Sequence, residues 1–155
     1  MDREYIPSND FQTPEWCCDL MVSMIPDGVN TVLEPTPGLG NIVRSLHKKN
    51  YNVIYPDNFW DVDGRFDAVV MNPPFTPMKK GYEILYKVME MSDIIIALMP
   101  WLCMINSEKR TRDIMEFGLK SITHLPRRTF KGSRVQTCIL NMRKGYRSNT
   151  IFTAV

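Results

Sequence analysis

Residues 31–46, TVLEPTPGLGNIVRSL, place a short apolar run, a glycine loop and an amphipathic segment in immediate succession. The apolar run is closed by Glu34 and a proline, which predicts a buried strand that ends at the acid. Ile42, Val43 and Leu46 recur at helical spacing, which predicts a helix behind the loop. A strand, a tight glycine turn and a helix in this order are typical of folds in which helices cover a parallel sheet.

The remainder of the chain continues this alternation of strands and helices. The Thr-Pro pair at 13–14 predicts a helix start, with Trp16, Leu20 and Met24 recurring at helical spacing behind it. The apolar run 93–99 predicts a strand that is buried on both faces. Further strands are expected at 52–55, 66–71, 121–125 and 135–142, and further helices at 83–91 and 107–117, the last capped by Ser107 and ended by Gly118.

This order predicts an α/β domain, a doubly wound, Rossmann-like and mostly parallel sheet with helices on both faces. With 155 residues and 44% apolar composition the chain has the size of one globular domain, so residues 1–155 are expected to form a single unit. In such sheets ligands bind beyond the carboxyl ends of the strands, so the residues that follow each strand are the candidates for function.

The net charge of +2 conceals an asymmetry along the chain. Residues 1–116 hold all 17 acidic residues with 11 basic ones, whereas residues 117–155 hold 8 basic residues and no acidic residue. This distribution indicates an anionic partner near the C-terminal end, with a solvated basic surface as the alternative.

The four cysteines, Cys17, Cys18, Cys103 and Cys138, lack metal-binding spacing and have only two histidines as helpers, so no metal site is expected. They also make a poor disulfide framework, which favours reduced thiols in a cytoplasmic protein. The N-terminus is too polar for a signal peptide, and the longest uncharged run, 94–107, is too short to span a bilayer. No membrane association is expected.

The loop at 34–41 fits neither of two common phosphate-binding motifs. A P-loop requires Gly-Lys-Ser/Thr, and the dinucleotide fingerprint requires a third glycine where Val43 stands. Glu34 at the strand end can neutralise a cation or accept hydrogen bonds from an amine. The segment resembles the S-adenosylmethionine loop of class I methyltransferases in its E-P-x-x-G-x-G form, with Pro37 as a departure and a plain strand–helix turn as the alternative. The resemblance implies cofactor contacts at Glu34, Pro35, Thr36, Gly38, Gly40 and Asn41.

The strand at 66–71 runs directly into Asn72, Pro73, Pro74 and Phe75. An aromatic amine is a poor nucleophile because its lone pair is delocalised into the ring. If Asn72 Oδ1 and the Pro73 carbonyl accept the two amino hydrogens, the nitrogen can pyramidalise and attack a methyl group while Phe75 stacks on the ring. The tetrapeptide resembles the catalytic (D/N)PP(Y/F) motif of amino-methyltransferases, an ordinary proline turn being the alternative.

Two further segments resemble cofactor motifs of the same family. The Asp-Phe-Gln-Thr-Pro segment before the first helix implies contacts from Phe11 and Thr13 with the methionine end, and a helix cap is the alternative. Asp57 suits the ribose hydroxyls, with Asn58 and Phe59 beside the adenine, and a solvated turn is the alternative. The family usually has a helix and a strand between that acid and the catalytic strand. Either this compact chain lacks that unit or one acid serves two roles.

Residues 125–142 resemble the loop and final strands of phage-type adenine-N6 DNA methyltransferases, whose loop borders the target base. The resemblance implies methyl transfer from S-adenosylmethionine to an exocyclic amino group of a nucleic-acid base, adenine N6 of DNA above all, after base flipping in a duplex. The alternatives are ribosomal RNA guanine-N2, a protein glutamine, and a non-catalytic subunit that binds cofactor or nucleic acid. Phosphates would be neutralised by Lys79, Lys80, Arg127, Arg128, Lys131 and Arg134. Since no separate target-recognition domain is expected, a homodimer or a partner subunit would supply target recognition, or the enzyme would accept many sequences.

Overall fold

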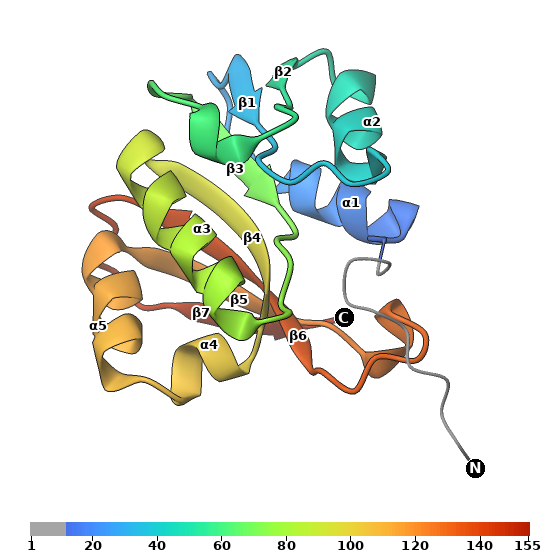
Figure 1. Ribbon diagram of the computed structural model, residues 1–155. Helices are drawn as coiled ribbons and strands as arrows, with labels where there is room; N and C mark the ends of the chain where they lie inside the picture. Colours follow the sequence, from blue (N-terminus) through green and yellow to red (C-terminus); the bar gives the residue numbers. More distant parts are fainter. Residues whose placement is uncertain (1–11) are drawn as a thin grey trace.

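The computed structural model describes residues 12–155, which form one sheet with helices on both faces (Figure 1). In this part of the chain the sheet has seven strands in the order β2-β1-β3-β4-β6-β5-β7. The strands are β1 (Thr31–Leu33), β2 (Asn52–Ile54), β3 (Ala68–Met71), β4 (Ile94–Pro100), β5 (Leu119–His124), β6 (Thr137–Arg143) and β7 (Ile151–Ala154). The helices are α1 (Glu15–Ser23), α2 (Asn41–Lys48), α3 (Met78–Met91), α4 (Leu102–Ile105) and α5 (Glu108–Phe117), with the short 3-10 helices η2 (Phe59–Asp61) and η3 (Arg127–Thr129).

Parallel pairing aligns the ends of the first four strands at one edge of the sheet. β1 pairs in parallel with β2 and with β3, and β3 pairs in parallel with β4. β6 runs antiparallel to β4 and β5, and β7 lies parallel to β5. Thr137, at the start of β6, lies opposite Pro100, at the end of β4. The loops after β1, β2 and β3 and the segment before β6 therefore emerge at the same edge.

β4 is buried on both faces, as its apolar run predicts. Ile95, Ala97 and Met99 pack into a cluster with residues of α3, α4 and α5. Ile96 and Leu98 pack into a second cluster with residues of α1 and α2. Because side chains alternate along a strand, one short segment supplies the core of both layers. The expected α/β class, with helices on both faces of a mostly parallel sheet, is confirmed.

Helix α1 buries a different side from the one that its spacing predicts. Trp16 is 44% exposed, and Leu20 and Met24 are only partly buried. Apolar residues occur on both sides of this helix, so periodicity alone does not select the side that is buried. The side with the small thiol side chains can pack closely on the sheet. The side that faces the core consists of Cys17, Cys18, Met21 and Val22.

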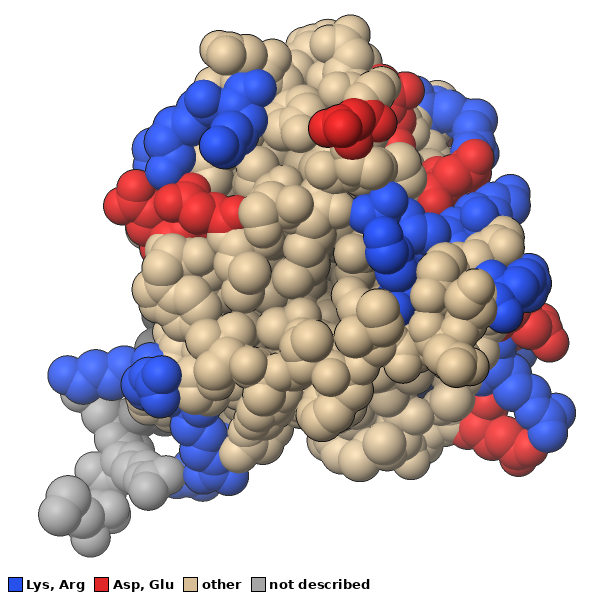
Figure 2. Space-filling view, turned by 180° about the vertical axis from the view of Figure 1, so that it is seen from behind, with Lys and Arg blue, Asp and Glu red and all other residues tan. Residues whose placement is uncertain are grey.

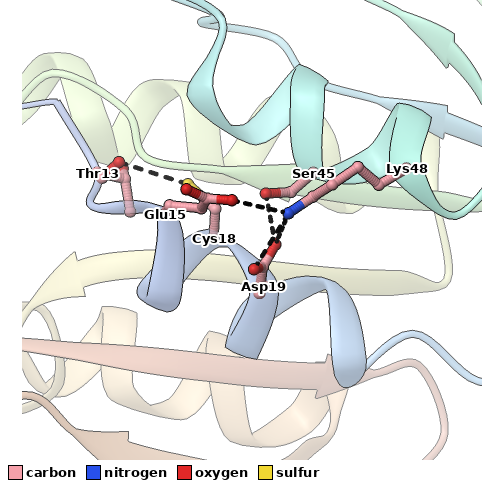
Figure 3. Close-up of polar contacts among 6 residues, drawn as sticks. All are labelled: Thr13, Glu15, Cys18, Asp19, Ser45 and Lys48. Atoms are coloured by element: carbon pink, nitrogen blue, oxygen red, sulfur yellow. Dashed lines mark hydrogen bonds and ion pairs between the residues drawn. The ribbon is translucent and has the colours of Figure 1, made fainter.

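Polar contacts join α1 to α2 at their solvent side (Figure 3). Lys48 Nζ lies 3.1 Å from Glu15 Oε1 and 2.9 Å from Asp19 Oδ1, and Ser45 Oγ donates to Asp19 Oδ1 at 2.8 Å. Exposed ion pairs of this kind contribute little to stability because water and salt screen them. The apolar side chains beneath them therefore supply most of the stability of the α1–α2 contact.

The expected elements are present, with differences at their ends. Ser107 caps α5 by accepting the N–H of Arg110 at 3.2 Å, as predicted. α3 begins at Met78, five residues before the predicted start at residue 83. The prediction began too late because the first turn of this helix carries few apolar residues and gives no periodic signal. The expectation that residues 135–142 form the last strand is wrong, since β7 follows it. All four residues of β7 are exposed, so its sequence lacks the alternation that marks a half-buried strand.

Between Asp57 and β3 the structure contains only η2, with no further strand–helix unit. This agrees with the compact form of the fold that the short spacing predicts.

All four cysteines are free and buried, and burial raises the pKa of the Cys17, Cys18 and Cys103 thiols to about 12. Within residues 12–155 no helix has the length and apolarity needed to cross a membrane.

Gly118 ends α5 as predicted, and its surroundings exclude a side chain. Its φ is +130°, and a Cβ built on it would lie 2.0 Å from the carbonyl oxygen of Arg143. We predict that Gly118→Ala lowers the free energy of unfolding by about 2 kcal/mol or more, because backbone strain is added to a backbone clash. Gly145→Ala is the matched control, since its φ is +84° with open space around it. Urea unfolding measures both variants, and equal losses would contradict the clash.

Candidate active site

A cavity of about 690 Å³ opens at the edge where β1, β2 and β3 end. This volume lies in the range typical of sites for small molecules and cofactors. The cavity is bounded by the loops after these three strands, by the segment before α1 and by the segment between β5 and β6. Its lining residues are 12–13, 34–38, 41–42, 56–60, 72–76, 78, 80, 84, 130, 133, 135 and 137.

The structure brings most of the sequence-predicted site residues together in this one cavity. Gly40 belongs to the same loop but does not line the cavity, and Phe11 lies outside the described residues. Of the predicted basic residues, Lys80 alone contributes to the lining. The predicted cofactor and catalytic residues that line it are Thr13, Glu34, Pro35, Thr36, Gly38, Asn41, Asp57, Asn58, Phe59, Asn72, Pro73, Pro74 and Phe75.

The glycine loop adopts backbone conformations that favour glycine. Gly38 and Gly40 have φ values of +52° and +84°. A Cβ on Gly38 would lie 3.1 Å from Oε1 of Gln12, and this same Oε1 accepts the N–H of Leu39 at 3.2 Å. Gly40 forms the N-cap of α2 without a side-chain cap, so backbone N–H groups at the start of α2 are left for other acceptors. The glycine at position 38 thus allows the side chain of Gln12 to approach the loop backbone closely.

Glu34 is buried at the end of β1, with only 1% of its surface exposed. Its Oε1 accepts the N–H of Thr36 at 2.7 Å. Burial raises the pKa of this carboxyl from 4.5 to about 8, and the hydrogen bonds from Thr36 only partly oppose the shift. A carboxyl with its pKa raised in this way is ready to ionise when a cationic group, such as the ammonium of an amino acid, enters the cavity.

Asn72 leaves the end of β3 with both its amide and its carbonyl engaged. Its Nδ2 donates to Thr13 Oγ1 at 2.9 Å. The Thr36 hydroxyl lies between two acceptors, 3.3 Å from the carbonyl oxygen of Asn72 and 3.4 Å from Oε1 of Glu34. The loop after β1 and the loop after β3 are therefore held together at the centre of the cavity.

Phe75 is partly buried and packs against the apolar clusters on both faces of the sheet. Behind it, α3 approaches the loop so closely that a Cβ on Gly81 would lie 2.8 Å from the carbonyl oxygen of Pro74. The ring of Phe75 would come within 3.4 Å of that same Cβ. A glycine on the first turns of α3 thus allows the helix to support the loop from below.

The segment after β2 supplies one wall of the cavity. Asp57 is exposed and lines the cavity, whereas Asn58 uses its Oδ1 to accept the N–H of Trp60 at 3.1 Å as the cap of η2. The ring of Phe59 is buried under Lys87, whose Nζ lies 4.2 Å from the ring centre. Trp60 is 52% exposed and lines the cavity, so it offers the larger aromatic surface here. Sequence reasoning missed Trp60, although a large aromatic residue just after an acid at a strand end was a usable signal.

The segment between β5 and β6 closes the opposite wall with Phe130, Ser133, Val135 and Thr137. The sequence placed this segment beside the target base but did not single out these residues. Arg127, Arg128, Lys131 and Arg134 are exposed on the same segment and do not reach the cavity. Lys79 is also exposed and forms an ion pair with Glu83 at 3.6 Å. The predicted phosphate contacts thus lie around the cavity rather than within it.

The basic side chains on the face opposite to that of Figure 1 form several separate groups (Figure 2). Some of these groups stand beside acidic side chains. One group, at the lower left of Figure 2, has no acidic side chain of the described residues beside it in this view. The basic side chains visible on this face therefore do not form one continuous patch.

Comparison with solved structures defines the class of the fold, which is that of the class I methyltransferases. A Listeria monocytogenes protein assigned to the class I S-adenosylmethionine-dependent methyltransferases superimposes on this chain with a TM-score of 0.74 at 14% identity. The match covers 98% of this chain and 68% of that protein. No family model and no curated protein matches the chain.

Other solved structures with this fold are described as a restriction-modification methyltransferase subunit and as an RNA methyltransferase. The methyltransferase subunit of a type I restriction-modification system of Streptococcus thermophilus has a TM-score of 0.68 at 15% identity, over 95% of this chain and 48% of the subunit. A protein of Pyrococcus horikoshii described as an RNA methyltransferase has a TM-score of 0.59 at 15% identity, over 86% of this chain and 87% of that protein. The chain thus spans about half the length of the restriction-modification subunit.

The buried carboxyl of Glu34 generates a prediction about stability. Because its pKa is about 8 in the folded protein and about 4.5 when exposed, the folded state binds more protons between these values. We therefore expect the free energy of unfolding to fall as pH rises from 5 to about 8 and then to level off. Glu34→Gln keeps an acceptor for the Thr36 N–H and removes the titration. Urea unfolding at several pH values should show a smaller fall for this variant, and parallel curves would contradict the burial argument.

Proposed function

We propose that the chain is an S-adenosylmethionine-dependent methyltransferase that acts on an exocyclic amino group of a nucleic-acid base, adenine N6 of DNA first. The observation that carries the proposal is the convergence of two motifs in one cavity. Glu34 and the glycine loop lie beside Asn72 to Phe75 in it, and the Thr36 hydroxyl bridges the two loops. A site for a cationic amino-acid group thus adjoins a site for an aromatic amine.

The residues of the cavity fit S-adenosylmethionine. Glu34 would hold the ammonium of its methionine part, the backbone of Gly38 would lie along that part, and Asp57 would accept hydrogen bonds from the ribose hydroxyls. The indole of Trp60 offers a flat surface for the adenine. When bound, the cofactor supplies an electrophilic methyl group on its sulfonium.

The loop after β3 would orient the amine. Asn72 Oδ1 and the Pro73 carbonyl would accept its two hydrogens, which draws the nitrogen lone pair out of the ring toward the methyl group. Phe75 would stack on the base, and Phe130 and Val135 would close the far wall against water. With these acceptors in place no side chain needs to remove a proton before the transfer.

Two further observations favour nucleic acid as the substrate. Residues 117–155 contain 8 basic residues and no acidic residue, and four of these cations lie on the segment between β5 and β6. Solved structures with the same fold include methyltransferase subunits of type I restriction-modification systems, among them the EcoKI M protein. We propose that a second copy or a partner subunit supplies target recognition, since one structure with this fold is described by the complex assembly of a type I restriction-modification system. The cytoplasm is the compartment that we propose for this reaction.

RNA guanine-N2 is the second candidate substrate, since the fold is shared with a protein described as an RNA methyltransferase. A protein glutamine is a weaker candidate because a basic rim beside the cavity does not suit a neutral peptide. A non-catalytic subunit would bind the cofactor or nucleic acid without turnover. Transfer of labelled methyl groups to adenine-rich DNA, to RNA and to a glutamine peptide distinguishes these four functions.

Asn72→Ala tests the proposed chemistry. Removal of the Oδ1 acceptor is expected to lower kcat by about 100-fold or more, because the amine loses one of two acceptors in the reacting state. The Kd for S-adenosylmethionine should change by less than about threefold, since Asn72 faces the amine. Labelled methyl transfer and calorimetry provide the two measurements, with Asn58→Ala as a comparison amide on the other wall. Full activity of Asn72→Ala would contradict the mechanism.

The basic segment generates a separate prediction about substrate binding. The double variant Arg127→Glu and Arg128→Glu should weaken binding to DNA and reduce the slope of log K against log salt. Lys144→Glu with Arg147→Glu is the matched control, because these exposed cations belong to the same basic part of the chain but lie beyond β6, at the opposite edge of the sheet. Fluorescence anisotropy at several salt concentrations measures both. Equal effects of the two double variants would contradict the proposed DNA contact and favour a solvated basic surface instead.

A further inference from the structure

The side-chain amide of Asn72 makes a single contact that bears on its role as an acceptor. Its Nδ2 donates to Thr13 Oγ1 at 2.9 Å, and Thr13 is 4% exposed. A carboxamide carries a donor at one end and an acceptor at the other, and the two ends are similar in size. Only one of its two rotations presents Oδ1 to an amine, and the other presents Nδ2, which the amino hydrogens cannot use.

We propose that Thr13 is a positioning residue that holds the amide of Asn72 with Oδ1 directed into the cavity. The inference rests on the proposed function, because it assigns the contact a role in orienting the amine. The Thr13 hydroxyl oxygen accepts the hydrogen bond from Nδ2, and the Oδ1 end of the amide is thereby left to the substrate. This role differs from the cofactor contact that the Thr-Pro segment implies, because it acts through Asn72.

Thr13 is itself held by contacts to two helices. Its carbonyl oxygen accepts a hydrogen bond from Asn41 Nδ2 at 2.8 Å, and the Cys18 thiol donates to this same oxygen at 3.5 Å (Figure 3). Asn41 is the first residue of α2 and Cys18 belongs to α1. The hydroxyl that meets Asn72 is therefore carried by a backbone position tied to the start of both helices.

The other side of Asn72 is held by the Thr36 hydroxyl, which lies 3.3 Å from its carbonyl oxygen. Backbone and side chain of Asn72 thus have separate anchors on separate loops. Loss of the Thr36 contact would move the backbone of the loop, whereas loss of the Thr13 contact would release the side-chain amide alone. The two effects are separable by experiment because only the second depends on residue 72 being an amide.

The experiment compares Thr13→Val with Thr13→Ser in labelled methyl transfer to DNA. Thr13→Val keeps the shape and removes the hydroxyl, so kcat at saturating cofactor should fall about tenfold, the equivalent of one hydrogen bond. Thr13→Ser keeps the hydroxyl and should restore kcat to within about twofold of the unaltered protein. Calorimetry should give a Kd for S-adenosylmethionine within about threefold for both variants. A Thr13→Val variant that binds the cofactor poorly but turns over normally at saturation would overturn the inference in favour of a cofactor contact.

The effect of Thr13→Val on kcat in an Asn72→Asp background distinguishes the positioning role from a merely structural one. A carboxylate has two equivalent oxygens, so its rotation has no wrong state, and Thr13→Val should lower kcat by less than about twofold there. An equal loss in the Asn72 and Asp backgrounds would overturn the inference, and so would the absence of turnover in Asn72→Asp alone. Failure of the unaltered protein to methylate any substrate would reject the proposed function. Turnover by the unaltered protein with an unimpaired Thr13→Val rejects the positioning role alone.

Discussion

The parallel pairing of β1 with β3 is the constraint on which the candidate site depends. Leu33 lies opposite Val69, and each strand is followed directly by its functional loop. Glu34 and Asn72, 38 positions apart in the sequence, therefore leave the sheet side by side, and Thr36 bridges their loops. A shift of one residue in this register would turn every side chain of the shifted strand to the opposite face and separate the two loops.

The pairing is secured by burial on both faces, and that burial also offsets the cost of the site. β3 and β4 are shielded on one face by α1 and α2 and on the other by α3, α4 and α5. At the edge of this core lie the buried carboxyl of Glu34, a loop in which Pro73 and Pro74 have no N–H donor, and glycines with positive φ. Each of these features disfavours the folded state to some extent. In return, a ligand can reach the charged carboxyl, the carbonyls of the proline loop and the backbone at the glycines.

Local patterns predicted the elements, and their failures have a common cause. The apolar side of α1 could not be chosen from spacing, because apolar residues occur on both sides of that helix and only the sheet beneath it selects one. β7 gave no signal because an exposed edge strand needs no alternation. The resemblance of two short motifs predicted the loops that line the cavity. Trp60 and Phe130, which form parts of two facing walls, depend on how separate segments meet and so were not visible.

The sequence by itself determined the class of fold, the order of strands and helices along most of the chain and the two loops that carry the candidate chemistry. These features depend on periodicity and on short motifs, and both are local properties of a chain. Only the tertiary structure decided which side of α1 is buried, that burial raises the pKa of Glu34, and that Thr13 engages the amide of Asn72. Desolvation and hydrogen bonding between distant residues arise only when the chain closes on itself, so no local pattern encodes them.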